Sequence, residues 1–289
     1  MSGHGASSLN LLAHPYQRLE PFTGGRAELK AAARCQGSAI VWLMGKAADP
    51  PELHLLRSRP GGLSLLTVLP RSPDILGNPA LIQAIQRLRP NGILPHHEEP
   101  RAAELAHVLR RPPLDLAMEV TDYLEWRGLR FDHDTVRLIR RIVELSESLR
   151  SVTGLARSMY MSRRALGRRF MTLGLPVPSH WLQMARLLRV VIRLQNSDDS
   201  VFSVACGQGY PDGFSVSNQM HRLFGCRPTE VRERLGWEWV FEEWLRREAE
   251  AGAFAPANAD KFSGTPLPRT APPALRKRTR ARRRDALQA

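Results

Sequence analysis

The chain has 289 residues, of which 43% are hydrophobic and 24% are charged, a composition typical of a soluble globular protein with room for about two domains. It has no apolar run near the roughly 20 residues of a membrane span, and no basic segment followed by an apolar core at its N-terminus, so we expect neither a membrane protein nor a secreted one. The net charge of +14 is uneven, with +8 on residues 150–236 and +7 on residues 269–289 against +2 on residues 1–149. This distribution is typical of a protein that binds nucleic acid, although binding to an anionic membrane surface would explain the positive charge equally well.

Short apolar runs alternate with helical stretches in the first part of the chain. Gly or Pro bounds each apolar run, which predicts buried strands at Ser38–Met44, Leu63–Leu69 and Gly92–Pro95. The helical stretches are Pro51–Arg57, Pro79–Leu88 and Arg101–Arg110. This alternation predicts parallel β-α-β units in a small doubly wound sheet.

The layout of this first part resembles a shortened receiver domain. A receiver that accepts a phosphoryl group has an aspartate where its central strand ends. The three expected strands end instead at Met44-Gly45, Leu69-Pro70 and Leu94-Pro95. We therefore expect a degenerate sensory or docking domain that is not phosphorylated.

Two helices are expected next, at Leu114–Trp126 and at Thr135–Leu149. The first ends at Gly128. The second has Val136, Ile139, Ile142, Val143 and Leu149 on one face, so it is expected to lead a helical domain. The domain boundary is therefore expected near residues 128–134.

A pair of short helices follows within residues 151–173. Ser151 and Ser162 are expected to cap them, because a serine hydroxyl accepts a hydrogen bond from the free N–H groups of a first turn. The apolar face of the second helix is Leu166, Phe170 and Leu173, and its opposite face carries Arg163, Arg164, Gly167, Arg168 and Met171. Guanidinium groups are not buried unpaired, whereas they contact phosphates and guanine edges readily, so this face is predicted to bind DNA.

A second pair of helices is expected within residues 199–224. Asp199 or Ser200 begins the first of them, which continues through Val204 and Ala205, and Asp212 caps the second. The outward residues of that second helix are Phe214, Ser217, Asn218, His221 and Arg222. One amphipathic helix at Ser179–Asn196 joins the two pairs, which form a weak internal repeat. Pattern alone leaves open a helical bundle whose charged face is merely solvated.

The end of the chain changes character twice. Apolar residues repeat at helical spacing at Trp237, Val240, Phe241, Trp244 and Leu245. Such a stripe usually packs on its own domain, with a dimer contact as the alternative. From Ala251 onward Ala, Pro and Gly dominate, and a basic cluster from Arg276 to Arg284 follows, which predicts a disordered tail.

Residues 151–232 resemble the DNA-binding domain of AraC/XylS-type transcriptional regulators, over roughly a third of the chain with the leading helix included. The matching residues of the first pair are Leu155, Ala156, Ser162, Leu166, Arg168, Phe170 and Gly174, and those of the second are Val204, Ala205, Gly209, Tyr210, Asp212, Phe224, Gly225, Pro228 and Arg232. Arg186 stands where the family usually has an arginine. Tyr210, Val216 and Met220 stand where phenylalanine is common, Tyr160 where glycine is favoured, and Asn218 where arginine is frequent. Asn218 therefore puts the usual base preference of the second reading helix in question.

Many members of the family have a jelly-roll domain at the N-terminus, but the many short alternating strands that it needs are not found here, and the alternation of strands and helices predicts a small α/β domain at residues 1–130 instead. The resemblance implies an all-α DNA-binding domain with two helix-turn-helix units and a helical extension at residues 131–249. A disordered basic tail at residues 250–289 completes the expected organisation.

No enzyme is expected from the sequence. The phosphate-loop, nucleophile-elbow and H-E-x-x-H motifs are missing, and no cofactor is implied. Three scattered cysteines predict neither a zinc site nor disulfides, which fits a reduced cytoplasm. The adjacent residues His96, His97, Glu98 and Glu99 could ligate a metal, but neighbours in an extended loop point in different directions, so no metal site is expected.

The favoured function is a bacterial, sequence-specific transcriptional regulator that reads two successive major-groove segments of double-stranded DNA, one with each unit. It would act in the cytoplasm at the nucleoid, with no membrane partner. RNA polymerase and a second copy of the chain are candidate further partners, and the effector is unknown. The alternative is a protein–protein adaptor that keeps the helical scaffold without reading DNA.

Deletion of residues 269–289 should weaken binding to specific and random duplexes by similar factors. The segment has eight basic groups and little apolar content, so its contacts should be to DNA phosphates. Each such contact should add about 0.9 to the slope with which the logarithm of affinity falls against the logarithm of salt concentration. Salt titrations of both affinities, for full-length and truncated protein, measure this. A truncation that removes the sequence preference but keeps the salt slope would contradict it.

Overall fold

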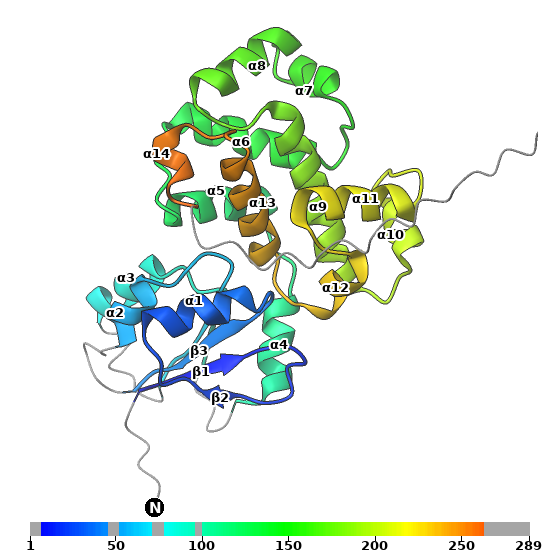
Figure 1. Ribbon diagram of the computed structural model, residues 1–289. Coiled ribbons are helices and arrows are strands. Elements are labelled where there is room, and N and C mark those ends of the chain that lie inside the picture. Colours follow the sequence, from blue (N-terminus) through cyan, green and yellow to red (C-terminus); the bar gives the residue numbers. More distant parts are fainter. Residues whose placement is uncertain (1–6, 46–51, 71–77, 96–99, 263–289) are drawn as a thin grey trace, which may run out of the picture.

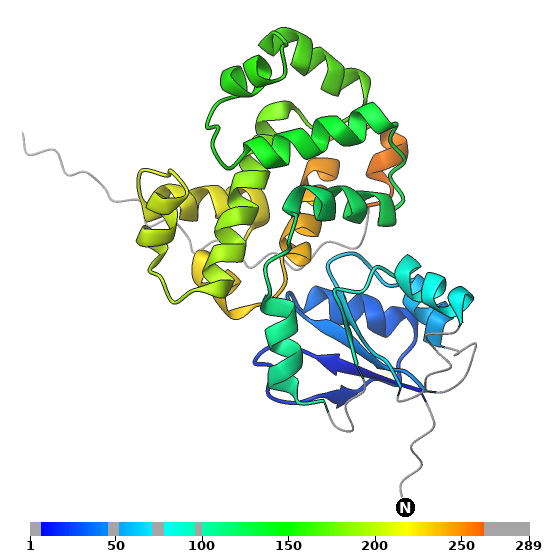
Figure 2. The same ribbon diagram turned by 180° about the vertical axis from the view of Figure 1, so that it is seen from behind.

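The structure is a computed structural model that describes residues 7–45, 52–70, 78–95 and 100–262, and it contains an α/β part and a larger helical part in contact with each other (Figure 1 and Figure 2). The expected basic tail from residue 263 onward lies outside these residues. The histidine and glutamate cluster at residues 96–99 lies outside them too. Among the described residues, no helix is long and apolar enough to cross a membrane.

A five-stranded sheet with the order β2-β1-β3-β4-β5 forms the centre of the α/β part. Strands β3 (Ala39–Leu43), β4 (Ser64–Val68) and β5 (Gly92–Leu94) pair in parallel, as the sequence predicts. Strands β1 (Ser8–Leu12) and β2 (Glu20–Pro21) extend the sheet beside β3 with antiparallel pairing. These two strands are not predicted from the sequence, because β2 has only two residues and β1 depends on pairing with β3, a strand distant in sequence.

Helices cover both faces of the sheet unequally. Helices α1 (Arg26–Arg34), α2 (Glu52–Arg57) and α3 (Pro79–Arg87) lie on one face and share a core with Ile40, Trp42 and Leu65. Helix α4 (Ala102–Arg110) covers the other face together with Leu235 from the helical part. A doubly wound sheet was the expectation. Both crossover helices, α2 and α3, lie on one face instead, because β3, β4 and β5 follow one another in space and right-handed crossovers then stay on the same side.

The helical part has one continuous apolar core. Its helices are α5 (Leu116–Trp126), α6 (His133–Leu145), α7 (Val152–Ser158), α8 (Arg163–Thr172), α9 (Pro178–Asn196), α10 (Val201–Gly207), α11 (Gly213–Phe224), α12 (Pro228–Glu233), α13 (Glu238–Glu250) and α14 (Pro256–Ala259). Helix α5, which the sequence places in the first domain of 130 residues, contributes Val120, Tyr123 and Leu124 to the core of the helical part. It packs directly against α6.

Residues 251–262 differ from the expected disordered tail. They form a turn and α14, and the rings of Phe254 and Phe262 are buried 5.3 Å apart against the helical core. Two aromatic side chains are enough to anchor this otherwise Ala- and Pro-rich segment, because each buries a large apolar surface. The Trp237–Leu245 stripe packs within the same core, as the sequence predicts.

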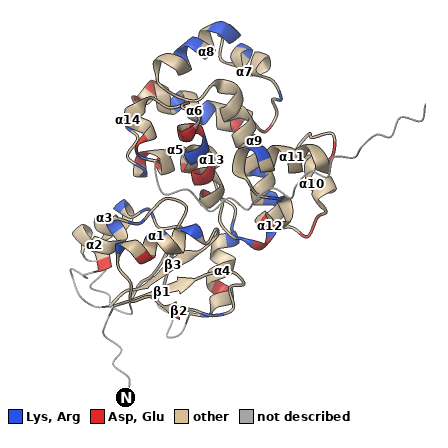
Figure 3. Ribbon diagram, viewed as in Figure 1, with Lys and Arg blue, Asp and Glu red and all other residues tan. Residues whose placement is uncertain are grey.

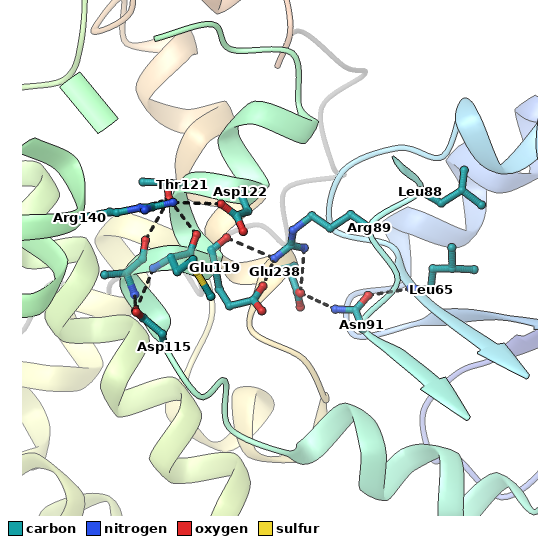
Figure 4. A network of polar contacts seen from close by, with 12 residues as sticks. Leu65, Leu88, Arg89, Asn91, Asp115, Glu119, Thr121, Asp122, Arg140 and Glu238 are labelled. Atoms are coloured by element: carbon teal, nitrogen blue, oxygen red, sulfur yellow. Dashed lines mark hydrogen bonds and ion pairs between the residues drawn. The ribbon is translucent and has the colours of Figure 1, made fainter. Parts of the chain in front are cut away.

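The two parts are joined first through Arg89, which follows α3 (Figure 4). Its guanidinium pairs with Glu119 of α5 and lies 3.4 Å from Glu238 of α13. Asn91 also donates a hydrogen bond to Glu238, while its Oδ1 accepts one from the backbone N–H of Leu65 at 2.8 Å. The segment that leads from α3 into β5 is thereby connected to α5 and α13 of the helical part.

A second connection lies at Glu242 of α13. Arg127 donates two hydrogen bonds to its carboxylate, of 2.9 and 2.7 Å, and the Tyr123 hydroxyl donates a third at 2.8 Å. The Tyr123 oxygen in turn accepts the backbone N–H of Gly62 at 2.8 Å. The neighbouring Gly61 has no room for a side chain, because a Cβ there would lie 2.2–2.5 Å from the Glu242 carboxyl atoms. Glycine at this position thus allows the loop of the α/β part to reach α13.

Substitution of Glu242 by glutamine should destabilise the protein by about 2–4 kcal/mol, since it leaves the mostly buried Arg127 without its counter-charge. The midpoint of thermal unfolding reports the change. The control is Glu125→Gln, which breaks an exposed pair with Arg130 and should cost less than about 1 kcal/mol. Equal losses for both variants would show that the buried Arg127–Glu242 pair stabilises the protein no more than an exposed pair does.

Candidate nucleic-acid interface

The first helix-turn-helix unit consists of α7 and α8. The Ser151 hydroxyl accepts a 3.1 Å hydrogen bond from Gly154 N–H, and the Ser162 hydroxyl accepts one of 3.1 Å from Ala165 N–H, so both expected caps are present. Leu166 and Phe170 are fully buried. Because α8 is fixed by its cap and these two side chains, its opposite face has a defined orientation.

Helix α8 is rich in basic residues (Figure 3), and those expected to contact DNA are not among its buried residues, Leu166 and Phe170. Arg163, Arg164, Arg168 and Met171 are exposed, with 73% of Met171 open to solvent. Gly167 lies among them, and a Cβ there would meet nothing within 4 Å. Within the described part of the chain, none of the three arginines has an ion-pair or side-chain hydrogen-bond partner, so their donors are available to a ligand.

The second unit consists of α10 and α11. Ser200 accepts a hydrogen bond of 3.1 Å from Ser203 N–H and caps α10, whereas Asp199, the alternative from sequence, pairs with Arg193 at 2.9 Å. Asp212 caps α11, because its carboxylate accepts a hydrogen bond of 2.7 Å from Ser215 N–H. Hydrogen bonding with Ser215 lowers the pKa of the Asp212 carboxyl. Val216, Met220 and Phe224 are buried, as the sequence predicts.

The outward residues of α11 are less uniform than those of α8. Phe214 is 81% exposed, and Asn218 and His221 are exposed as well. Ser217 is half-buried. Arg222 is exposed but donates a 3.0 Å hydrogen bond to Gln183 Oε1 of α9, so a protein contact already orients it.

Two exposed aromatic residues of the units were not assigned a role from sequence. Phe202 of α10 is 62% exposed and lies against Gly213 at the start of α11. The sequence could have indicated that Phe202 is exposed, because it does not share the helical face of Val201, Val204 and Ala205. Tyr160 in the first unit's turn is fully exposed and has φ +55°, a conformation that explains why glycine is favoured there.

Helix α9 holds the two units in one fixed arrangement. It contacts α7 and α8 of the first unit and α10 and α11 of the second. Arg186 of α9 donates to the carbonyls of Gln208 and Gly209 at 3.3 Å each, and its guanidinium lies 4.3 Å from the Tyr210 ring centroid. Arg186 therefore fixes the turn of the second unit. Gln195 bonds the carbonyls of Val231 and Gly236 in the same way at the other end of α9.

The structure gives no sign of a metal centre in the residues that it describes, since no three His, Cys, Asp or Glu side chains gather there as ligands would. Cys226 is buried, which raises the pKa of its thiol to about 12, and Cys35 and Cys206 are exposed and free.

Comparison with known proteins agrees with this geometry. Residues 155–234 match the family model of a helix-turn-helix domain. The chain is also similar to a crystal structure of a transcriptional regulator from Chromobacterium violaceum, which is described as belonging to the AraC-type DNA-binding domain-containing proteins. The two sequences are 27% identical, the match covers 35% of this chain and 94% of the other chain, and the TM-score is 0.31. A search of curated proteins gave no match. Residues 155–234 of this chain therefore form a helix-turn-helix domain.

Proposed function

We propose that the protein is a sequence-specific transcriptional regulator that inserts α8 and α11 into successive major-groove segments of one face of the duplex. Such segments lie about 34 Å apart. The observation that carries this proposal is the face of α8, where Arg163, Arg164 and Arg168 are exposed on a capped, core-packed helix without partners among the described residues. Arginines in that state suit phosphates and guanine edges.

The two reading helices differ in the bases that they would prefer. Arg164 and Arg168 lie one helical turn apart on α8 and suit the N7 and O6 acceptors of guanine. On α11, Asn218 suits the donor and acceptor of adenine, and the exposed ring of Phe214 suits the methyl group of thymine. We therefore propose an operator with a guanine-containing segment under α8 and an A·T-rich segment under α11.

The adaptor alternative rests on a separate observation. Tyr160, Met171, Phe202 and Phe214 are large apolar side chains that are each more than 60% exposed on the two units. Exposed apolar side chains of this size also mark protein-binding surfaces. An adaptor has no need for three unpaired arginines beside them, so we favour DNA.

The α/β part is proposed to be a sensory or docking unit. Because α5 shares the core of the helical part, the division between the two units is proposed to lie between α4 and α5, before the boundary near residue 130 that the sequence suggested. A regulator of this kind would act on the nucleoid in the cytoplasm. RNA polymerase and a second copy of the chain remain candidate partners.

Substitution of Arg168 by alanine should reduce affinity for a duplex selected from a random pool by roughly 5- to 150-fold, which corresponds to the about 1–3 kcal/mol of one bidentate guanine contact. Affinity for random duplex should fall much less. Arg87→Ala, which removes an exposed arginine of the α/β part, is the control and should change neither. Equal losses on selected and random DNA would make Arg168 a phosphate contact. No loss of affinity for either duplex would show that α8 does not lie in the major groove.

Replacement of thymine by uracil in the segment under α11 should weaken binding of the wild type about fourfold, because a buried methylene-sized group contributes about 0.8 kcal/mol. The Phe214→Ala variant should bind both duplexes alike. Fluorescence anisotropy with the two duplexes measures this, and uracil placed under α8 serves as the matched control. A uracil effect that persists in Phe214→Ala would contradict the assignment of this ring to a thymine methyl.

A further inference from the structure

A cavity of about 450 Å³ lies where the α/β part meets the helical part. Helix α1 forms one wall, and α13 with Lys261 and Phe262 forms the opposite wall. The loop at residues 58–62, which touches α13 through Gly61 and Gly62, closes the cavity between them. Its volume falls within the range of small-molecule sites, and such sites favour junctions of this kind.

The walls of this cavity are strongly basic. Seven lysine and arginine side chains line it, against two glutamates. Three of the seven, Arg26, Lys30 and Arg34, repeat every fourth residue on α1 and are exposed. Like charges at that spacing on a helix repel one another, so the arrangement is unfavourable without a counter-ion.

No carboxylate in the described residues neutralises the three cations of α1. They have no ion pair or side-chain hydrogen bond there. The two glutamates of the cavity are already engaged, Glu242 by Arg127 and Glu243 by Arg246 and Arg247. The uncompensated charge therefore lies on the α1 wall, and it faces a wall whose own charges are largely paired.

We propose that this cavity binds a small polyanion, a molecule with two or more phosphate or carboxylate groups, held mainly by Arg26, Lys30 and Arg34. A small ligand suits the site better than a duplex does, because the cations line a hollow between two parts of the molecule rather than the outward face of a helix. The ligand would contact both parts at once. The site is separate from the reading faces of α8 and α11, so the proposal stands or falls independently of the proposed function.

Isothermal titration calorimetry of the full-length protein with inorganic tripolyphosphate and with citrate, at constant ionic strength, tests the proposal. At least one probe should bind saturably with a stoichiometry of one. The Lys30→Gln/Arg34→Gln variant should weaken that binding about tenfold or more, because two charge-assisted contacts are lost. Preference for tripolyphosphate over citrate would identify phosphate as the recognised group, and the reverse would identify carboxylate.

Two control variants separate this site from general anion binding. Arg57→Gln/Arg87→Gln removes the same charge from exposed positions of the α/β part that do not line the cavity, and it should leave probe binding unchanged. Arg164→Ala/Arg168→Ala removes the DNA-reading arginines and should also leave it unchanged. The proposal is overturned if neither probe binds saturably, if both glutamine variants weaken binding equally, or if the α8 variant abolishes it.

Discussion

The packing of α13 is the constraint on which the rest of the structure depends. Its apolar face enters the helical core, where the ring of Trp244 lies 4.9 Å from that of Trp181 on α9 and stacks on Phe241 at 5.7 Å. Helix α9 in turn contacts both helix-turn-helix units. The other face of α13 presents Glu238 to Arg89 and Glu242 to the loop at Gly61 of the α/β part. Helix α13 therefore supports the positions of α8 and α11 through α9, and it attaches the α/β part to them.

This arrangement gives the α/β part a physical connection to α11. Glu243 of α13 holds Arg246, which lines the basic cavity, and also Arg247. The Arg247 guanidinium donates a 3.4 Å hydrogen bond to the carbonyl of Arg222 in the last turn of α11, close to the left-handed Gly225 that ends this helix. The two parts are held together both by charge pairs of α13 and by the apolar contact of Leu235 with the core beside the sheet. Of these two kinds of contact, the charge pairs are the ones that a bound ion could change.

Local patterns predict the elements well and their long-range contacts poorly. Strands β3, β4 and β5 and the caps Ser151, Ser162 and Asp212 follow from apolar runs and cap residues that act within a few positions. Helix α1 was missed although its Ala-rich sequence and the Glu28 of its capping box are local signals. The Glu238 and Glu242 contacts could not be predicted, because glutamates on a helix usually face solvent and their partners lie 115–149 residues away. The outward residues of α8 and α11 could be named from sequence, since periodicity and caps fix which face a helix buries, and their DNA contacts stay a prediction.

The central claim is that α8 and α11 read two different segments of one operator. Selection of duplexes from a random pool by the full-length protein, followed by sequencing, tests it most directly. The account predicts one enriched motif with two parts centred about 10 base pairs apart, one containing guanine and the other A·T-rich. Enrichment of a single short segment would show that only one unit reads DNA. A pool without any enriched motif, despite binding, would contradict sequence-specific recognition.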